Sequence, residues 1–190
     1  MRHLRLLTVV AVLLALAPVG AASAAPDRTL VVAAGETTTW NGAPAIGANA
    51  YYYGVVGPPA PASVGPVAQG TCSKDVYHYC EQTLIQLSNP LTQMEIDKGI
   101  TELYRSVTVR LSDYGPAPDP LTDFDLLMFA SDQNGTVGPE LDSDGDLTDT
   151  ANETVTAEVA TTVAAPSVYV LVRVVYFTSA NSGYKATLMF

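Results

Sequence analysis

The chain has 190 residues, of which 48% are hydrophobic, so it is long enough to bury one sizeable core. Its 9 Lys and Arg residues stand against 19 Asp and Glu residues, which gives a net charge of −10 at pH 7. An acidic surface repels phosphate backbones and anionic lipid headgroups, so we expect no nucleic-acid partner. Acidity also serves solubility alone, and it does not by itself indicate a ligand.

The first 24 residues are typical of a secretory signal peptide. Arg2 and Arg5 precede an apolar run over residues 6–17, and a small-residue stretch ends in Ala-Ser-Ala at Ala24. The alternative is an uncleaved anchor helix, but spanning a bilayer takes about 20 apolar residues. We therefore expect cleavage after Ala24, a secreted, extracellular protein and no stable membrane span. Because Arg2 and Arg5 leave with the leader, the mature chain has 7 Lys and Arg and a net charge of −12.

Strand patterns dominate the mature chain. Residues 103–111 alternate strictly between apolar and polar side chains, and residues 168–177 are apolar on both faces, as in a strand buried on both sides. Clusters of Gly, Pro, Asn and Asp separate such runs at the spacing of a sandwich. The sequence therefore predicts an all-β fold, a jelly-roll-like antiparallel β-sandwich of eight or nine strands. The expected strands span residues 29–33, 37–40, 50–56, 77–87, 103–111, 124–129, 153–163, 168–177 and 184–190.

One segment carries a helical signal and another is linker-like. Residues 91–100, bounded by Pro90 and Gly99, predict one or two helical turns. The Pro- and Gly-rich residues 57–70 are interpreted as a loop within one domain, with an inter-domain linker as the alternative. The expected organisation is a signal peptide, an N-terminal arm or first strands, this loop, and the sandwich domain, at residues 1–24, 25–56, 57–70 and 71–190.

The cysteine and histidine content limits the chemistry. Cys72 and Cys80 are the two cysteines, and export to an oxidising space predicts a structural disulfide between them, with metal or redox roles as alternatives. His78 is the one histidine after the leader, so a two-histidine zinc site is absent and a Ser-His-Asp triad would have to use His78. We therefore expect no enzymatic activity. Paired carboxylates are the remaining route to a small hydrolase.

An acidic segment carries carboxylates in a calcium-loop pattern. Asp142, Asp144, Asp146 and Glu153 occupy relative positions 1, 3, 5 and 12, which supply oxygen ligands in an EF-hand loop. Position 6 is Leu147 instead of Gly, and no flanking helices are visible. Calcium binding is one interpretation, and a solvated acidic turn between strands is the other.

Aromatic side chains suggest a second kind of site. Trp40 and the run Tyr51, Tyr52 and Tyr53 are candidates for a platform that stacks on sugar rings or polymer side chains. The alternative is packing in the core or at the rim of the sandwich, because Tyr is also a favoured strand residue.

The order of these features resembles the bacterial pre-peptidase C-terminal domain family. The similar pieces are the entry into residues 77–87 after the cysteines, VTVRL at 107–111, DFDLLMF at 123–129, DQNG at 132–135, ETV at 153–155, YVLVRVVY at 169–176 and, near the start, WNG at 40–42. The resemblance implies a secreted jelly-roll sandwich without catalysis that in some relatives binds polymeric substrate. It also implies that Asp123 and Asp125 would take part where carboxylates bind calcium.

The leading hypothesis is a secreted, non-catalytic binding or accessory module that recognises an extracellular polymer or a secreted protein surface. The alternative is a calcium-stabilised structural or interaction domain. The third hypothesis is a small hydrolase that uses the acidic loops.

Overall fold

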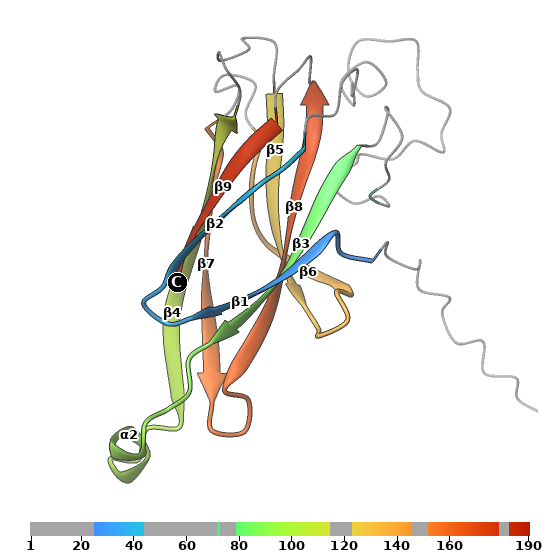
Figure 1. Cartoon of the computed structure of the whole chain (residues 1–190). Coiled ribbons are helices and arrows are strands. Elements are labelled where there is room, and N and C mark those ends of the chain that lie inside the picture. The colour runs from blue at the N-terminus through green and yellow to red at the C-terminus, as the bar shows by residue number, and fades with distance from the viewer. Residues whose placement is uncertain (1–24, 44–71, 73–78, 115–122, 146–151, 179–182) are drawn as a thin grey trace, which may run out of the picture.

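The structure is a computed structural model that describes residues 25–43, 72, 79–114, 123–145, 152–178 and 183–190. The expected strand at 50–56 and the loop at 57–70 lie outside these residues. Nine strands and one short helix make up the described part (Figure 1), which confirms the predicted all-β sandwich. The elements are β1 (Arg28–Ala33), β2 (Thr37–Asn41), β3 (Cys80–Ser88), α2 (Gln93–Asp97), β4 (Glu102–Tyr114), β5 (Asp123–Ser131), β6 (Val137–Asp144), β7 (Thr154–Thr162), β8 (Ser167–Thr178) and β9 (Gly183–Met189).

The strands form two sheets that pack face to face. The five-stranded sheet has the order β1-β3-β8-β5-β6, and the four-stranded sheet has the order β2-β9-β4-β7. The β1–β3 pair is parallel and the other pairs are antiparallel. β1 and β2 follow each other in the chain but belong to different sheets, so their connection joins the two layers along one side. Gly35 lies in this connection with φ 85°, a conformation that favours Gly.

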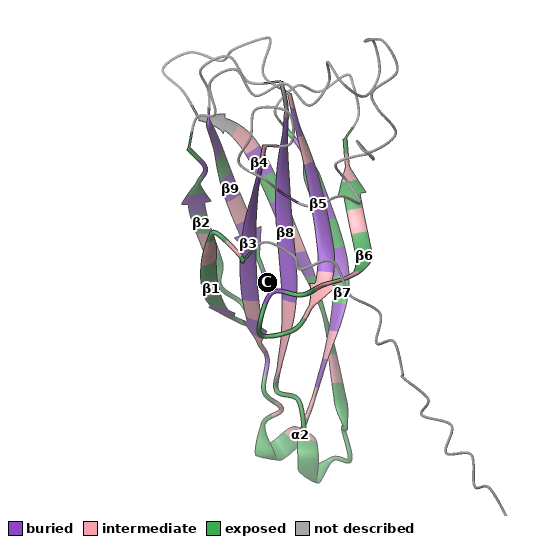
Figure 2. Cartoon of the chain, turned by 90° about the vertical axis from the view of Figure 1, so that its right-hand side faces the viewer, coloured by how far each residue is buried: buried purple, intermediate pink, exposed green. Residues whose placement is uncertain are grey.

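The core fills the space between the sheets, as the period-2 pattern requires. Val107, Val109 and Leu111 of β4 are buried there, opposite the alternate residues of β8, Val170, Val172 and Val174. Figure 2 shows this buried interior and the exposed end that carries α2. Alternation places every second side chain of a strand on the outside, so the sheets also present two outer faces.

β8 is buried on both faces, as its apolar sequence predicts. Its inward residues join the main core, while Leu171 and Val175 pack with Cys80, Leu127 and Phe129 in a second cluster on the opposite face. Arg173, on that second face, is 2% exposed, and its guanidinium carbon lies 5.1 Å from the centre of the Phe129 ring. The second cluster explains why this strand lacks an alternating pattern.

Two elements refine the sequence predictions. The predicted helix at 91–100 is a single turn, which begins at a capping box between Thr92 and Glu95. β6 was not predicted as a strand, because Gly138, Pro139 and its acidic residues are typical of a turn. As an edge strand that pairs on one side with β5 only, β6 tolerates these residues.

Candidate functional site

Four carboxylates are close enough to influence one another's pKa. Two of them belong to the start of β5, which lies at the end of the sandwich opposite α2 (Figure 1). Asp123 and Asp125 begin β5, Asp144 ends β6, and Glu153 precedes β7; we call these four residues the acidic end. Gly145 lies against them, since a Cβ at that position would come within 3.0 Å of Asp125 Oδ1. The three strands thus bring together residues up to 30 positions apart.

Burial and mutual repulsion shift the acidity of this end. Glu153 is 2% exposed, and its Oε1 has no hydrogen-bond partner among the described residues. Burial, followed by the hydrogen bond and the charge of Asp144, raises the pKa of Glu153 to about 8. Burial and the charges of Asp123 and Asp144 raise the pKa of Asp125 to about 6. Glu153 therefore holds a proton at neutral pH.

The acidic end does not converge on one point. Asp144 is in register with Leu126 and shares its face of the sheet, whereas Asp125 is the neighbour of Leu126 and faces the other side. Among the described residues, no three His, Cys, Asp or Glu side chains are grouped so that they could hold a metal ion. The carboxylates therefore repel each other electrostatically, but as placed they do not form a metal-binding site among the described residues.

The first two carboxylates of the EF-hand-like pattern lie on a strand and bind backbone N–H groups of the neighbouring sheet. Asp142 and Asp144 are strand residues of β6, so the expectation of one loop or turn from Asp142 onward is wrong. Their Oδ2 atoms accept hydrogen bonds from the backbone N–H groups of Thr156 (2.7 Å) and Thr154 (2.8 Å). These bonds satisfy the open edge of β7. Asp146 lies outside the described residues.

A second candidate surface is the outer face of the four-stranded sheet. Hydroxyl side chains alternate with core residues on all four of its strands, and none of them was singled out from the sequence. They are Thr37 and Thr39 on β2, Thr187 on β9, Ser106, Thr108 and Ser112 on β4, and Thr154, Thr156 and Thr162 on β7, and we call this set the hydroxyl face.

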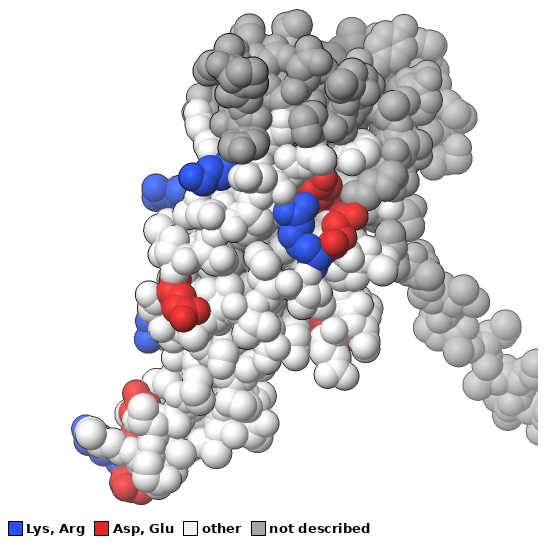
Figure 3. Space-filling model, in the orientation of Figure 1, with Lys and Arg blue, Asp and Glu red and all other residues white. Residues whose placement is uncertain are grey.

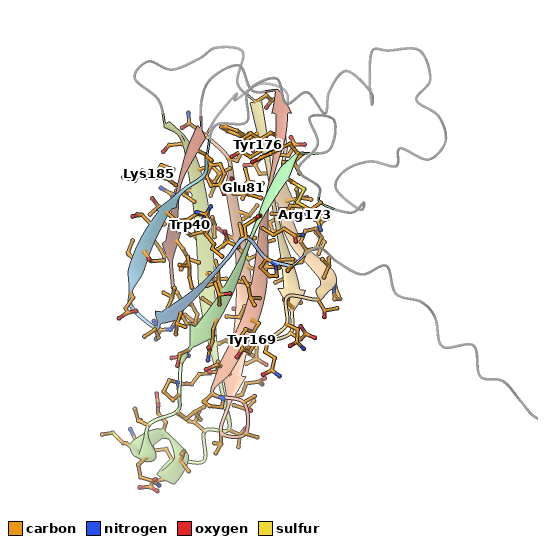
Figure 4. All side chains as sticks on the ribbon, turned by 45° about the vertical axis from the view of Figure 1, so that its right-hand side comes forward. Trp40, Glu81, Tyr169, Arg173, Tyr176 and Lys185 are labelled. Carbon is orange, nitrogen blue, oxygen red and sulfur yellow. A yellow bond between two sulfur atoms is a disulfide. The ribbon has the colours of Figure 1, made fainter. Side chains whose placement is uncertain are left out.

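The strand register arranges the hydroxyl face in rows. Thr39 is opposite Thr187, and Thr108 is opposite Thr156, with 3.0 Å between the two Oγ1 atoms. Arg110 lies in the row of Thr187 and Thr154, and Lys185 lies opposite Ser112. Figure 4 shows Lys185 at the margin of the sandwich, and Figure 3 shows both basic and acidic atoms along the side on which β4 and β9 lie.

The aromatic candidates divide between the core and the undescribed segments. Trp40 is 7% exposed and belongs to the main core. Its ring therefore packs inside the sandwich and is not available to stack on a ligand. Tyr51, Tyr52 and Tyr53 lie outside the described residues. Tyr104 on β4, which sequence reasoning missed, is 61% exposed, and its hydroxyl donates to Glu102 at 2.6 Å.

A buried polar group lies near the N-terminal strands. The Glu81 carboxylate is 5% exposed and accepts hydrogen bonds from Arg28 Nη2 (3.0 Å) and from the Tyr184 hydroxyl (2.9 Å). The backbone N–H of Ala43 donates to its other oxygen at 3.3 Å. These bonds connect Glu81 of β3 to β1 and β9, so the carboxylate helps to hold the two sheets together. Figure 4 shows Glu81 beside Tyr176 in the upper part of the sandwich.

The predicted disulfide between Cys72 and Cys80 is confirmed. It attaches residue 72 to the first residue of β3, beside the second hydrophobic cluster. His78 lies outside the described residues. Within the described residues, no helix has the length and apolarity needed to cross a membrane.

These features define an antiparallel-rich β-sandwich. No protein-family model matches the sequence, and no curated protein matches it. Among solved structures, the chain is similar to the pre-peptidase C-terminal domain of collagenase from Bacillus anthracis, with 8% sequence identity and a TM-score of 0.32 over 86% of this chain and 96% of that chain. Similarity at this level shows no family and carries no argument about function.

Proposed function

We propose that this protein is a secreted, non-catalytic module that recognises an extracellular polymer through the hydroxyl face. The observation that supports the proposal is the array of exposed and half-buried Thr and Ser side chains in register on neighbouring strands. Each hydroxyl is both a donor and an acceptor, so the face can bond to a polymer that repeats such groups.

The sheet makes this array rigid and regular. Neighbouring strands lie about 4.8 Å apart, and side chains on one face of a strand repeat about every 6.6 Å. β4 has β9 on one side and β7 on the other, and its inward residues Val107 and Val109 are fully buried. A surface fixed in this way loses little conformational entropy when it binds. An extended polymer strand could follow β4 from Ser106 to Ser112.

Co-sedimentation with insoluble polymers tests this proposal. The mature protein is mixed with chitin, cellulose, collagen or peptidoglycan, and the bound fraction is measured for wild type and for the double variant Thr108→Val/Thr156→Val. Valine keeps the shape and strand preference of Thr and removes both hydroxyls of the bonded pair, so the fold is expected to persist. The matched control is Thr29→Val on β1, an exposed threonine of the other sheet.

We expect wild type and Thr29→Val to sediment with one of these polymers, and the double variant to bind at least about fivefold more weakly, since one net hydrogen bond is worth about 1 kcal/mol. Binding by the double variant equal to that of wild type contradicts the hydroxyl face as the contact surface. Absence of binding to any polymer contradicts the function.

Calcium binding at the acidic end is the second candidate, because the buried Glu153 Oε1 has no hydrogen-bond partner in the part of the chain that the structure describes and is close enough to Asp144 to feel its charge. Calcium prefers six to eight oxygen ligands. Glu153 and Asp144 would supply part of that number, and the bound ion would replace the proton of Glu153.

Thermal unfolding in calcium and in EDTA tests this second candidate. Calcium at about 100 times its dissociation constant should stabilise the protein by about 2.7 kcal/mol, and Glu153→Gln should abolish the gain. Glu158→Gln, on the exposed side of β7, is the control that should keep it. Identical melting curves in calcium and in EDTA contradict calcium binding.

A further inference from the structure

We propose that the polymer bound at the hydroxyl face is a polysaccharide that carries carboxylates, and that Arg110 and Lys185 hold those carboxylates. This inference rests on the proposed function and adds the ligand class and the two charged residues. The two cations lie among the side chains of the hydroxyl face.

Arg110 and Lys185 are diagonal neighbours on paired strands. Arg110 of β4 is in register with Thr187 of β9, and Lys185 is two residues from Thr187 along the same strand. Diagonal neighbours on one face have Cβ atoms about 7–8 Å apart, which is within reach of long side chains. Both residues are exposed and point away from the core. They therefore form one cationic site.

Neither cation is neutralised within the described part of the chain. The ion pair found there joins Arg28 to Glu81, and the described residues show no ion pair or hydrogen bond for the charged groups of Arg110 and Lys185. In a chain with about twice as many acidic as basic residues, such an arrangement is unexpected by composition alone. Two unpaired positive charges leave the site open to an anionic group.

The carboxylates of the same outer face are distant from this site. Glu158 lies opposite Ser106, four residues from Arg110 along β4, which corresponds to about 13 Å. Glu102 is farther along the same strand. Both separations exceed the screening length of about 8 Å at physiological ionic strength. Asp144 lies beyond the edge of β7, where its carboxylate accepts the Thr154 N–H bond and keeps its charge. On the outer face itself, no carboxylate lies directly opposite Arg110 or Lys185 among the described residues.

The surrounding groups fit a sugar chain. Thr39, Thr187, Ser112 and Thr154 lie in the two rows that contain Arg110 and Lys185. The Arg fork binds a carboxylate through two parallel hydrogen bonds, Lys adds a point charge, and the hydroxyls match those of sugar rings. Thr187, Thr154 and Ser112 lie directly opposite Arg110 and Lys185, whereas the exposed apolar side chains of this face, Tyr104 and Met189, lie outside those two rows. A protein partner is less suited to these rows, because protein hot spots need large apolar anchors.

The density of negative charge along the ligand distinguishes a polysaccharide from a nucleic acid. Duplex DNA carries a charge about every 1.7 Å along its axis, and a protein with a net charge of −10 repels such a polymer. A polysaccharide with one carboxylate in each sugar or disaccharide unit carries its charges much more sparsely. A site with two cations among hydroxyls suits a sparsely charged chain, so a polysaccharide is favoured over a nucleic acid.

Calorimetric titration with two soluble polysaccharides tests the inference. Hyaluronan carries one carboxylate in each disaccharide, and dextran is neutral. The variants are Arg110→Gln/Lys185→Gln and, as the matched control, Lys98→Gln, an exposed cation at the C-terminus of α2 at the other end of the molecule. Thermal melts check that the variants fold, and a salt series measures the ionic contribution.

We expect hyaluronan to bind more tightly than dextran, with an affinity that falls as salt rises. Arg110→Gln/Lys185→Gln should weaken hyaluronan binding at least about tenfold, while Lys98→Gln stays within about twofold of wild type. Equal loss in both variants would mean general charge attraction and would overturn the inference.

Failure of this inference can be told apart from failure of the proposed function. Binding of hyaluronan or of neutral polymers that depends on Thr108 and Thr156, but not on Arg110 and Lys185, keeps the proposed function and overturns the inference. Absence of binding to every polymer overturns both.

Discussion

The proton held by Glu153 predicts how stability depends on pH. Its pKa is raised to about 8 in the folded protein from its usual 4.5, so the folded state binds a proton that the unfolded state has lost over the interval between these values. For one such group, the free energy of unfolding falls by about 1.4 kcal/mol for each pH unit. This stabilisation is complete below pH 4.5 and is lost as pH rises through 8. Between pH 6.0 and 7.5, the free energy of unfolding should therefore fall by about 2 kcal/mol.

Glu153→Gln isolates this contribution, because the amide has nearly the same volume and does not titrate. Urea unfolding is measured at pH 5.5, 6.5 and 7.5 in EDTA, for wild type, Glu153→Gln and Glu158→Gln. The advantage of Glu153→Gln over wild type should grow by about 2.5 kcal/mol from pH 5.5 to 7.5, while the exposed Glu158→Gln follows the wild-type slope. A constant difference between Glu153→Gln and wild type at all three pH values would refute the buried, protonated Glu153.

Two further predictions concern groups within the fold. Tyr184→Phe removes a buried hydroxyl that donates to Glu81 at 2.9 Å, and it should destabilise the protein by about 1.5–3 kcal/mol in urea unfolding. A loss below about 0.5 kcal/mol would contradict this bond. Replacing Cys72 and Cys80 by Ser should lower the free energy of unfolding by roughly 2–3 kcal/mol. A reductant should lower the stability of wild type by the same amount and should not change the stability of the variant. A reductant effect of equal size in both proteins would contradict the disulfide as its cause.

The fold could be predicted wherever packing imposes a period on the sequence. Val107, Val109 and Leu111 must face the core together, so strict alternation identified β4, and the two-sided apolar run identified β8. β6 could not be predicted as a strand, because it carries Pro139 and acidic side chains. A strand with neighbours on both sides would not tolerate these residues, but β6 pairs on one side only. Local composition could not distinguish that edge strand from a turn.

The candidate sites were harder to predict because they depend on which strands become neighbours. The carboxylates of the acidic end are prominent in the sequence, but the faces of Asp125 and Asp144 follow from the β5–β6 register. The hydroxyl face joins β2, β9, β4 and β7, whose order comes from long-range pairing. Each strand shows its alternating Thr residues, yet the rows that include Arg110 and Lys185 exist only after the sheet has formed.

Chemical-shift mapping of the isotopically labelled mature protein, titrated with a soluble fragment of a polymer that it binds, locates the contact surface. Hydroxyl-face recognition predicts that the largest amide shifts fall on the outward-facing positions of β4, β7 and β9, around Thr108, Thr156 and Thr187. Shifts confined to α2 or to the acidic end, with these positions unchanged, would contradict it.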